Sequence, residues 1–403
     1  MIPPNSFFRS AWSALAALTI SLGAPLHAQT TEPYPFAFLS NALLTAKVYL
    51  PDAARGFVRG PRYVTAGIVG RVETKGHSYF GNFLDPHDPT SLGAAAGLID
   101  EFRVPLGYEA AAPGESFAKI GVGLVKKEAG EYNFGRHYQV ERFAPWTVSS
   151  NAGSLTFIQD FSFKSWGWRF EKTISLDPRS AALTLRHRLK NTGALAFSNS
   201  HYDHNFVSID GEKMGPDYRA AFNFYTPSAQ VDPNEVLIEK NLWLVRSDFA
   251  GKNGNLIPVR GFEFVKGDPT IFVENQKAKA GLAISVQGPI REFFVFVHEK
   301  AFCPEPFIAM KLKPSEETSW EFHYRFFEGP MDIPPTSSLD DRAYHGLSRI
   351  SLDGVPLTTF QISKTNYTIP LILPSQPPRL AAESINPKDR IEIVNPGAGR
   401  GEG

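Results

Sequence analysis

Between residues 40 and 330 the chain alternates apolar and polar side chains, the period-two pattern of half-buried strands. Leu183, Leu185, His187 and Leu189 share one parity, and so do Trp320, Phe322, Tyr324 and Phe326. Further strand-like runs cover 154–158, 161–163, 166–170, 172–176, 283–286 and 292–298, with Gly, Pro and Asn turn signals between them. No convincing helical period appears. The pattern predicts an all-β, antiparallel sandwich or barrel.

Residues 1–28 have the pattern of an export signal. Arg9 supplies positive charge, an apolar run extends over 11–26, and Ala28 ends a plausible cleavage site. The run is short and is broken by Gly23 and Pro25, which argues against a membrane anchor. We therefore expect cleavage after Ala28, no membrane span, and a periplasmic or secreted protein.

The remaining sequence divides at about residue 330. Residues 29–330 carry the strand pattern and are expected to form the β domain. Residues 331–403 are rich in proline and glycine, which predicts an extended, partly disordered C-terminal extension. Within it, residues 368–373 are apolar enough to pair as an edge strand or to dock on a partner.

Composition narrows the classes of partner. Lys and Arg total 41, as do Asp and Glu, so the formal net charge is zero and no basic stripe indicates nucleic acid binding. Aromatic residues make up 13% of the chain, which suits a β-sheet core and also suits a sugar binder. The one cysteine, Cys303, excludes an internal disulfide and is expected to be a buried thiol.

The densest group of ionisable residues lies in the segment 199–206. His201, Asp203 and His204 follow a predicted strand and the turn 191–193. Two imidazoles and a carboxylate this close together can transfer protons near neutral pH, because histidine titrates there. This segment is the first candidate for catalytic chemistry.

A second candidate is Glu305, which stands between Pro304 and Pro306. Each proline ring fixes its own φ and restricts the residue before it, so the glutamate has a stiff, non-helical mount. Such a mount suits a general base. The alternative is a solvent-exposed loop glutamate that the prolines keep extended.

Other polar residues carry weaker signals. Asp85, His87 and Asp88 offer ligands for a divalent cation, but their spacing favours a Pro-rich Asx turn. Arg62 and Arg103 are scattered cations that could hydrogen-bond hydroxyls or carboxylates. No Gly-rich phosphate loop, Gly-x-Ser-x-Gly elbow, His-Glu-x-x-His or paired Cys-x-x-Cys is present. Nucleotide-binding, α/β-hydrolase, zincin and zinc-ribbon classes are therefore disfavoured.

Over residues 40–328 the chain resembles the galactose mutarotase-like (aldose 1-epimerase-like) superfamily. The pieces that carry the resemblance come in the family's order: 189–193, then 199–206, then Cys-Pro-Glu-Pro at 303–306 followed by 312–314 and the aromatic strand 319–326. The resemblance implies a large antiparallel β-sandwich (supersandwich). The family's early Asn-Arg-Ile motif and His-Gly-Gly segment are not found, and Ser315 replaces the usual glycine of the late turn.

The resemblance also implies roles for individual residues. Glu305 matches the family's general base, which lies in a late loop, and His204 its general acid, with His201 as the alternative acid. His137 is the one histidine in the region of the missing early segment. Residues assigned to substrate binding are His137, Arg62, Arg103, Tyr202 and Asn205. No metal and no organic cofactor is required, and the ligand is a mono- or oligosaccharide.

Three functions remain open on this fold. The first is aldose 1-epimerase-like interconversion of sugar anomers, by proton removal from the anomeric hydroxyl and protonation of the ring oxygen. The second is a polysaccharide lyase or glycosidase-type reaction, in which Tyr202, His204 and Arg103 could serve β-elimination at a uronate. The third is carbohydrate binding without catalysis, with Trp166, Trp168 and Trp320 as stacking platforms.

Overall fold

The computed structural model describes residues 33–226, 231–265, 267–333, 347–356, 379–384 and 390–393. Strands dominate these residues, and the helical structure among them is one short 3₁₀ helix, η1 (Phe262–Phe264). The prediction of an all-β chain is confirmed. None of the helices in this part of the chain is long and apolar enough to cross a membrane. The expected signal segment 1–28 and the apolar piece 368–373 lie outside the described residues.

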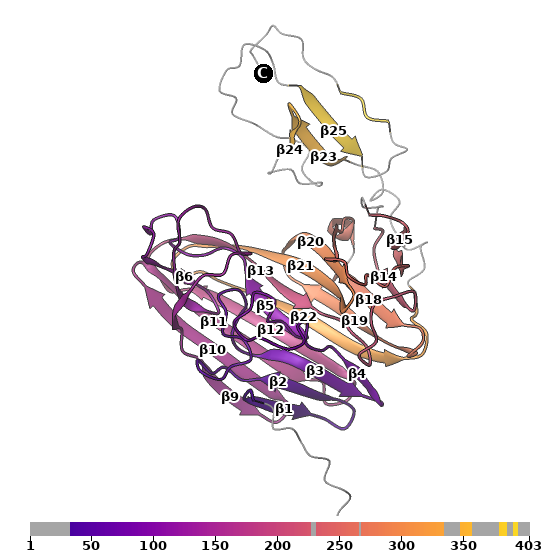
Figure 1. Cartoon of the computed structure of the whole chain (residues 1–403), viewed down its shortest axis with the longest axis horizontal. Helices are drawn as coiled ribbons and strands as arrows, with labels where there is room; N and C mark the ends of the chain where they lie inside the picture. The colour runs from indigo at the N-terminus through magenta and orange to yellow at the C-terminus, as the bar shows by residue number, and fades with distance from the viewer. Residues whose placement is uncertain are drawn as a thin grey trace, which may run out of the picture. The chain divides into compact units, whose positions relative to one another are not determined.

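The first large sheet has nine strands in the order β1-β2-β3-β5-β13-β21-β20-β17, with β4 paired to β3 (Figure 1). Its strands are β1 (Phe36–Ser40), β2 (Thr45–Tyr49), β3 (Ile68–Thr74), β4 (His77–Tyr79), β5 (Leu98–Phe102), β13 (Phe197–Asn205), β17 (Asn255–Pro258), β20 (Ile290–His298) and β21 (Ala301–Leu312). The order places β13 between β5 and β21, so these three strands form the centre of the sheet.

The second large sheet has ten strands in the order β15-β16-β14-β18-β19-β22-β12-β11-β10-β9. Its strands are β9 (Thr147–Asn151), β10 (Ser154–Phe163), β11 (Trp166–Leu176), β12 (Ala182–Asn191), β14 (Tyr218–Phe222), β15 (Val236–Glu239), β16 (Leu242–Val245), β18 (Thr270–Asn275), β19 (Ala280–Gln287) and β22 (Glu317–Glu328). The strand pairings within both large sheets are antiparallel.

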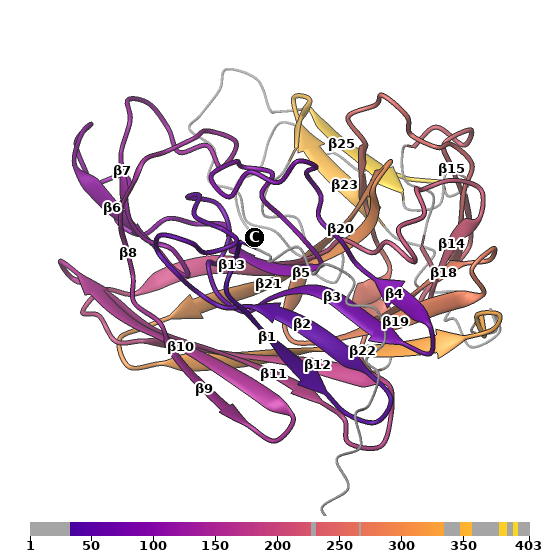
Figure 2. The ribbon, with the colours of Figure 1, turned by 60° about the horizontal axis from the view of Figure 1, so that its bottom comes forward.

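The two large sheets pack face to face and enclose one apolar core (Figure 2). On β12 and β22 the predicted inward parity is confirmed, because Leu183, Leu185, His187, Leu189, Trp320, Phe322, Tyr324 and Phe326 are all buried. Rings from the two sheets meet directly: Phe102 of β5 lies 5.0 Å from Phe170 of β11 in an edge-to-face contact. The large antiparallel sandwich is therefore the observed architecture.

Glu305 lies inside a strand, which differs from the loop that the resemblance implied. β21 passes through Pro304 and Pro306 without a break, and β20 pairs with it there. The N–H of Phe302 points toward the chain after β13, where it bonds the carbonyl of Val207. By the period of a strand, the two prolines turn their missing N–H groups the same way. The β13–β21 ladder reaches only to the pair Tyr202↔Phe307, so it does not include the residues from Pro304 to Pro306.

Two small sheets complete the described residues. One consists of β6 (Ser116–Lys119), β7 (Gly123–Lys126) and β8 (Val140–Phe143). The other consists of β23 (Leu347–Leu352), β24 (Val355–Pro356) and β25 (Leu380–Ser384), within the segment predicted to be an extended tail. In β23, the apolar Ile350 and Leu352 stand on either side of the polar Ser351, and β25 pairs with this strand, so this part of the extension forms a sheet.

Candidate functional site

The candidate site lies on three neighbouring strands of the nine-stranded sheet. Glu101 of β5, Tyr202 and His204 of β13, and Glu305 of β21 lie on one face, because residues two apart on a strand share a face. Arg62, Lys119 and Cys303 complete the group. We call these residues the His204 cluster: Arg62, Glu101, Lys119, Tyr202, His204, Cys303 and Glu305.

His204 lies between two carboxyl groups. Its Nδ1 is 2.7 Å from Glu305 Oε1, and its Nε2 is 3.0 Å from Glu101 Oε2. An ionised carboxylate only accepts hydrogen bonds, so two such partners require protons on both ring nitrogens. The contacts therefore fit an imidazolium. The Cys303 thiol, 3.4 Å away, donates to the same Glu305 oxygen.

Glu101 is fully buried and is held by several donors. Arg62 Nε and the Tyr202 hydroxyl donate to its Oε2 at 2.9 and 2.8 Å. Lys119 Nζ lies 3.9 Å from its Oε1 and donates to the backbone carbonyl of Arg62 at 2.7 Å. These contacts fix the position of the Glu101 carboxylate opposite His204.

The charges in the cluster shift one another's pKa values. Burial by itself would lower the pKa of His204, but the Glu305 charge and the hydrogen bonds to both carboxylates outweigh it and raise the pKa. Burial opposes ionisation of Glu101, yet Arg62 and His204 hold its pKa well below the usual range. Burial lowers the pKa of Lys119 to about 8, with Glu101 opposing the shift.

The cluster is more open on the Glu305 side. Glu305 keeps 9% of its side-chain surface exposed, whereas Glu101 keeps none. The Arg62 side chain is 20% exposed, and the exposed ring of Phe134 lies 5.3 Å from its guanidinium. A polar ligand that meets Arg62 and Glu305 would therefore reach the Nδ1 edge of His204. The arrangement can offer that ligand one proton donor and one proton acceptor side by side.

The opposite face of the same strands carries a second buried network, the Asp100 cluster: Asp100, Lys172, His187, His201 and Asp203. It lies between the sheets, where β11 contributes Lys172 and β12 contributes His187. Asp100 accepts from Lys172 Nζ at 2.6 Å and from His187 Nε2 at 3.0 Å. Burial, then the neighbouring Asp100, raises the pKa of Asp203 well above its usual value. Burial opposes ionisation of Asp100, but Lys172 and His187 hold its pKa well below the usual range.

Two groups among the described residues bring enough donor atoms together to hold a metal ion. They are Asp100, His187, His201 and Asp203, and His204, Cys303 and Glu305. In the first group, His201 Nδ1 accepts a hydrogen bond from Trp320 Nε1 at 3.0 Å, which leaves the ring proton on Nε2, facing Asp100. In the second, the paired carboxylates favour a proton on each nitrogen of His204. Hydrogen bonding accounts for the second group. In the first group, both carboxylate oxygens of Asp203, together with His187 Nδ1 and His201 Nε2, are buried without a hydrogen-bond partner in the described part of the chain.

Not all the residues predicted for the site share its face. Tyr202, His204, Glu305 and Arg62 come together. Asn205 lies on the opposite face, where its amide donates to the Pro304 carbonyl at 2.7 Å and its oxygen accepts from Tyr324. His201 is buried there too, so its assignment as the alternative acid does not fit. Strand alternation separates His201 and Asn205 from Glu305.

Arg103 and His137 lie outside the cluster. Arg103 pairs with Glu292 at 3.3 Å and lies over the ring of Phe307, which stacks on Tyr202. Exposed His137 donates from Nε2 to the carbonyl of Thr90 at 3.0 Å. A ligand bound at the His204 cluster would have to extend beyond the cluster to reach either side chain.

The segment with Asp85, His87 and Asp88 forms a turn, as the sequence favours. Asp88 Oδ1 accepts hydrogen bonds from the backbone N–H and the hydroxyl of Thr90. His87 stacks on Phe57 at 3.9 Å and contacts its carbonyl oxygen through Nε2 at 2.8 Å. His87 and Asp88 thus have separate partners.

Sequence reasoning did not single out Glu101 or Lys119. Both carry a recognisable signal: the apolar run 94–99 leads directly into Asp100-Glu101, and Lys119 stands between Ala118 and Ile120. A charge inside a short apolar strand is rarely buried without a partner. That rule marks both residues as members of a buried pair, although it cannot name the partner.

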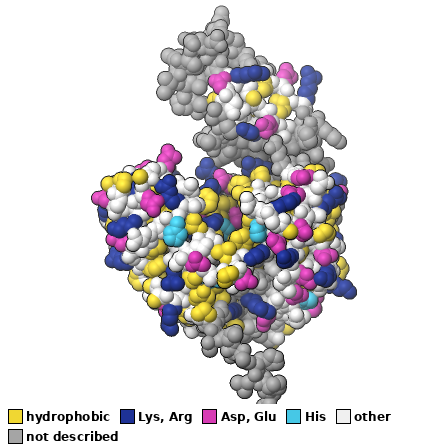
Figure 3. Space-filling view, viewed as in Figure 1, with side chains coloured by type: hydrophobic (Ala, Val, Ile, Leu, Met, Phe, Trp, Pro, Cys, Tyr) yellow, Lys and Arg dark blue, Asp and Glu magenta, His cyan; other side chains and the backbone are white. Residues whose placement is uncertain are grey.

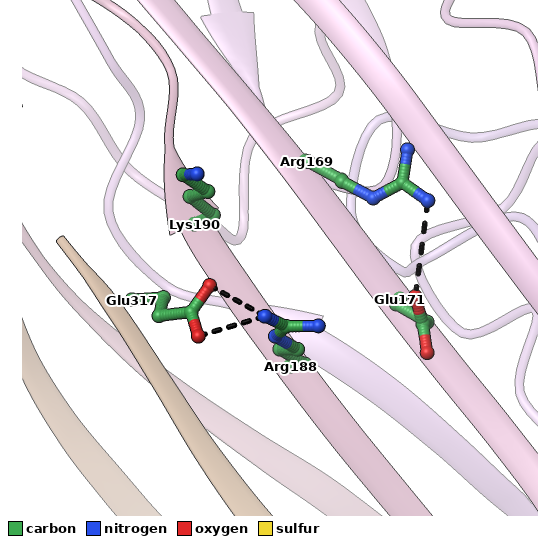
Figure 4. A pocket seen from close by; sticks show the side chains of 5 residues that line it. All are labelled: Arg169, Glu171, Arg188, Lys190 and Glu317. Atoms are coloured by element: carbon green, nitrogen blue, oxygen red, sulfur yellow. Dashed lines mark hydrogen bonds and ion pairs between the residues drawn. The ribbon is translucent and has the colours of Figure 1, made fainter. Parts of the chain in front are cut away.

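Two surface cavities lie away from the His204 cluster. One, of about 200 Å³, is on the outer face of the ten-stranded sheet and is lined by Arg169, Glu171, Arg188, Lys190 and Glu317 (Figure 4). The other, of about 520 Å³, includes His77 and Asp210, which pair at 2.8 Å. Basic and acidic side chains are interspersed on the surface (Figure 3). The charges that line these cavities are largely paired, so we give the cavities no catalytic role.

No family model matches the chain, and no curated protein is similar to it. Among solved structures, an aldose epimerase homologue from C. elegans is 11% identical over 74% of this chain and 100% of its own, with a TM-score of 0.47. A galactose mutarotase-like protein from Clostridium acetobutylicum is 14% identical over 72% and 94%, with a TM-score of 0.46. A galactose mutarotase related enzyme from Lactobacillus acidophilus is 11% identical over 74% and 99%, also at 0.46. These proteins belong to the group that the sequence resembles, and at these values the likeness assigns no activity.

Proposed function

We propose that this protein is a carbohydrate-active enzyme that interconverts sugar anomers, with His204 as general acid and Glu305 as general base. The observation that carries the proposal is the 2.7 Å contact between His204 Nδ1 and Glu305 Oε1. It joins a cationic acid to a carboxylate at the partly open side of the cluster. The ligand is a mono- or oligosaccharide.

The reaction needs two proton transfers at one carbon. Glu305 removes the proton from the anomeric hydroxyl while His204 protonates the ring oxygen, and the ring opens to the aldehyde. Rotation about the C1–C2 bond and closure on the other face give the second anomer. The anomeric carbon bears both the hydroxyl oxygen and the ring oxygen. An acid and a base that lie next to each other can therefore reach the two oxygens of one sugar. A positioned proton-transfer group contributes about 10²–10⁴-fold in rate.

The lyase-type alternative draws support from Arg62, a partly exposed cation beside a tyrosine that could bind a uronate. Its weak point is the base. Burial, then Glu101, raises the pKa of Tyr202 well above its usual value, and the hydroxyl donates to Glu101. Tyr202 is therefore poorly suited to removing a proton from carbon.

The binding-only alternative relied on exposed tryptophans. Trp168 and Trp320 are instead buried in the core, and Trp166 is partly buried against it. The indole N–H groups of Trp168 and Trp320 bond Gln159 and His201. Two of the three expected stacking platforms are therefore structural.

The deciding experiment is proton NMR of freshly dissolved α-anomers of common aldoses with the purified protein. The variants Glu305→Gln and His204→Asn should each slow anomer equilibration by about 10²–10⁴-fold. The matched control Glu317→Gln removes an exposed carboxylate of the ten-stranded sheet and should leave the rate unchanged.

A folded wild-type protein that does not accelerate equilibration would refute anomer interconversion. The same preparation would then be given uronate-containing polysaccharides, and new unsaturated ends would establish the lyase alternative. Circular dichroism of each variant separates loss of chemistry from loss of fold.

The expected export is part of the proposal. The apolar run 11–26 and the cleavage site at Ala28 support a periplasmic or secreted enzyme that meets sugars outside the cytoplasm. N-terminal sequencing of the protein recovered from the expressing cell tests this. A mature N-terminus at Gln29 is expected, and a cytoplasmic chain that keeps Arg9 would contradict it.

A further inference from the structure

We propose that Glu101 is a positioning residue that retains the Nε2 proton of His204, so that the proton given to the sugar is the one on Nδ1. This inference rests on the proposed function and extends it to a residue that the sequence did not point to. It assigns different tasks to the two carboxylates on either side of one imidazole.

The contacts of Glu101 suit a fixed partner. Its Oε2 accepts from His204 Nε2, from Arg62 Nε and from the Tyr202 hydroxyl, all within 3.0 Å. With no exposed surface and three donors on one oxygen, the carboxylate has no free rotation. Charge-assisted bonds of this kind are short and directional.

The contacts of Glu305 suit a residue that can exchange its hydrogen bond with His204 for one with a sugar hydroxyl. It meets Nδ1 at 2.7 Å, retains some exposed surface, and its Oε1 receives one further protein contact, from the Cys303 thiol. A sugar hydroxyl can therefore insert at the Nδ1 side, whereas the Nε2 side is closed by Glu101 and its donors.

The proton balance follows from this asymmetry. Glu305 takes the proton from the anomeric oxygen, the bond between C1 and the ring oxygen breaks as the C1 carbonyl forms, and Nδ1–H protonates the ring oxygen. His204 is then neutral with its proton on Nε2, donating to Glu101. Ring closure reverses both transfers and regenerates the imidazolium and the carboxylate.

Several charged or titratable groups face His204 and set its charge. Glu101 comes from β5, Tyr202 from β13, Cys303 and Glu305 from β21, and Arg62 and Tyr63 from the segment before β3. Lys119 of β6 lies 3.9 Å from Glu101 Oε1, whereas His204 bonds the other oxygen of that carboxylate. Arg62 opposes the imidazolium, and the two carboxylates favour it. Without the Glu101 charge, Glu305 is the one carboxylate left to favour the imidazolium against Arg62.

The test is a ¹⁵N and ¹H NMR titration of the His204 ring in the full chain, assigned by comparison with His204→Asn. In the wild type we expect a pKa above that of ordinary histidine and, once neutral, a proton on Nε2. In Glu101→Gln the pKa should fall by about one unit or more, and the basic limb of kcat/KM should move with it. Glu101→Asp should restore most of the shift, and Glu317→Gln should have no effect.

An unchanged His204 pKa in folded Glu101→Gln, or a neutral form protonated on Nδ1, would overturn the inference. If Glu101→Gln does not fold, Tyr202→Phe replaces it. Removing one donor leaves more of the Glu101 charge to His204, so the pKa should rise, and a fall would contradict the assignment. The NMR titration needs no substrate, so its failure is distinct from failure of anomer interconversion, which only the rate assay reports.

Discussion

His201 and His204 lie three residues apart on one strand and have opposite electrostatic environments. His204 faces two carboxylates, which raise its pKa despite burial. Around His201, burial outweighs Asp100 and lowers the pKa. His187, also beside Asp100, is lowered to about 4 by burial, with Asp100 opposing the shift. At this scale, the neighbours of a histidine decide whether it serves as a proton donor or as a neutral structural group.

The neutral His187 makes stability depend on acidity. In the unfolded chain a histidine binds a proton near pH 6.5, whereas folded His187 does so only near pH 4. Stability from this group is therefore complete above pH 6.5 and falls as the pH drops toward 4, by about 3 kcal/mol in all. His187→Gln should flatten this part of the pH profile of urea unfolding.

The control for that measurement is His323→Gln, at a histidine on the outer face of β22. Its profile should follow the wild type. Equal slopes in the wild type and His187→Gln would show that the buried imidazole is not the group that titrates on unfolding.

Some of these roles could be predicted from the sequence alone. The two-residue period placed His187 on the inward parity of its strand, and the spacing of prolines marked Glu305 as rigidly mounted. The partnership of Glu101 with His204 was out of reach, because it joins residues 103 positions apart through the pairing of β5 with β13. Strand pairing over such a distance depends on the whole fold.

At the scale of elements, the short strand β5 determines where the charged residues lie. It carries Asp100 toward the core and Glu101 toward the outer face. Gly97 directly precedes it with φ of 49°, and its carbonyl accepts from the N–H of Phe206 at 3.0 Å. A Cβ at this position would lie 1.8 Å from the carbonyl oxygen of Val69. The start of β5 thus depends on a glycine.

Gly97→Ala should destabilise the fold by more than about 3 kcal/mol, because it adds a backbone clash to an unfavourable φ. The matched control is Gly76→Ala in the β3–β4 turn, where φ is 82° and no atom lies within 4 Å of the added carbon. That change should cost about 1 kcal/mol, from the left-handed conformation alone. Chemical unfolding of both variants measures the difference, and similar losses would exclude the clash as the cause.

Element-level predictions succeeded where periodicity was strong and failed where prolines intervened. The aromatic alternation of β22 was visible, and so was the strand that became β12. The stretch around Glu305 was expected as a loop, since proline disrupts a sheet ladder. Here both prolines lie in the part of β21 that forms no ladder with β13, and the Asn205 amide donates to the Pro304 carbonyl instead.

At the scale of the whole molecule, the Asp100 cluster joins the two large sheets. Asp100 and His201 come from the nine-stranded sheet, and Lys172 and His187 from the ten-stranded one. The ion pair of Lys172 with Asp100 is fully buried at 2.6 Å. Removing one partner of such a pair leaves an uncompensated charge in the core.

Lys172→Met should therefore lower the free energy of unfolding by about 3–5 kcal/mol. Adding Asp100→Asn to it removes the orphaned charge, so the double variant should lose less than the sum of the two single variants. A double-mutant cycle by urea denaturation gives the coupling. Additive losses would mean that the pair contributes no joint stabilisation.

The use of both faces of β13 also limits how the chain can vary in length. One added residue between Phe197 and His201 would move every later side chain of the strand to the opposite face, exchanging His204 with Asp203. Proton-donating and core-filling residues would trade places at once. Within β13, a change in length keeps every side chain on its present face only when two residues are added or removed together, whereas the turn before the strand can absorb a single residue.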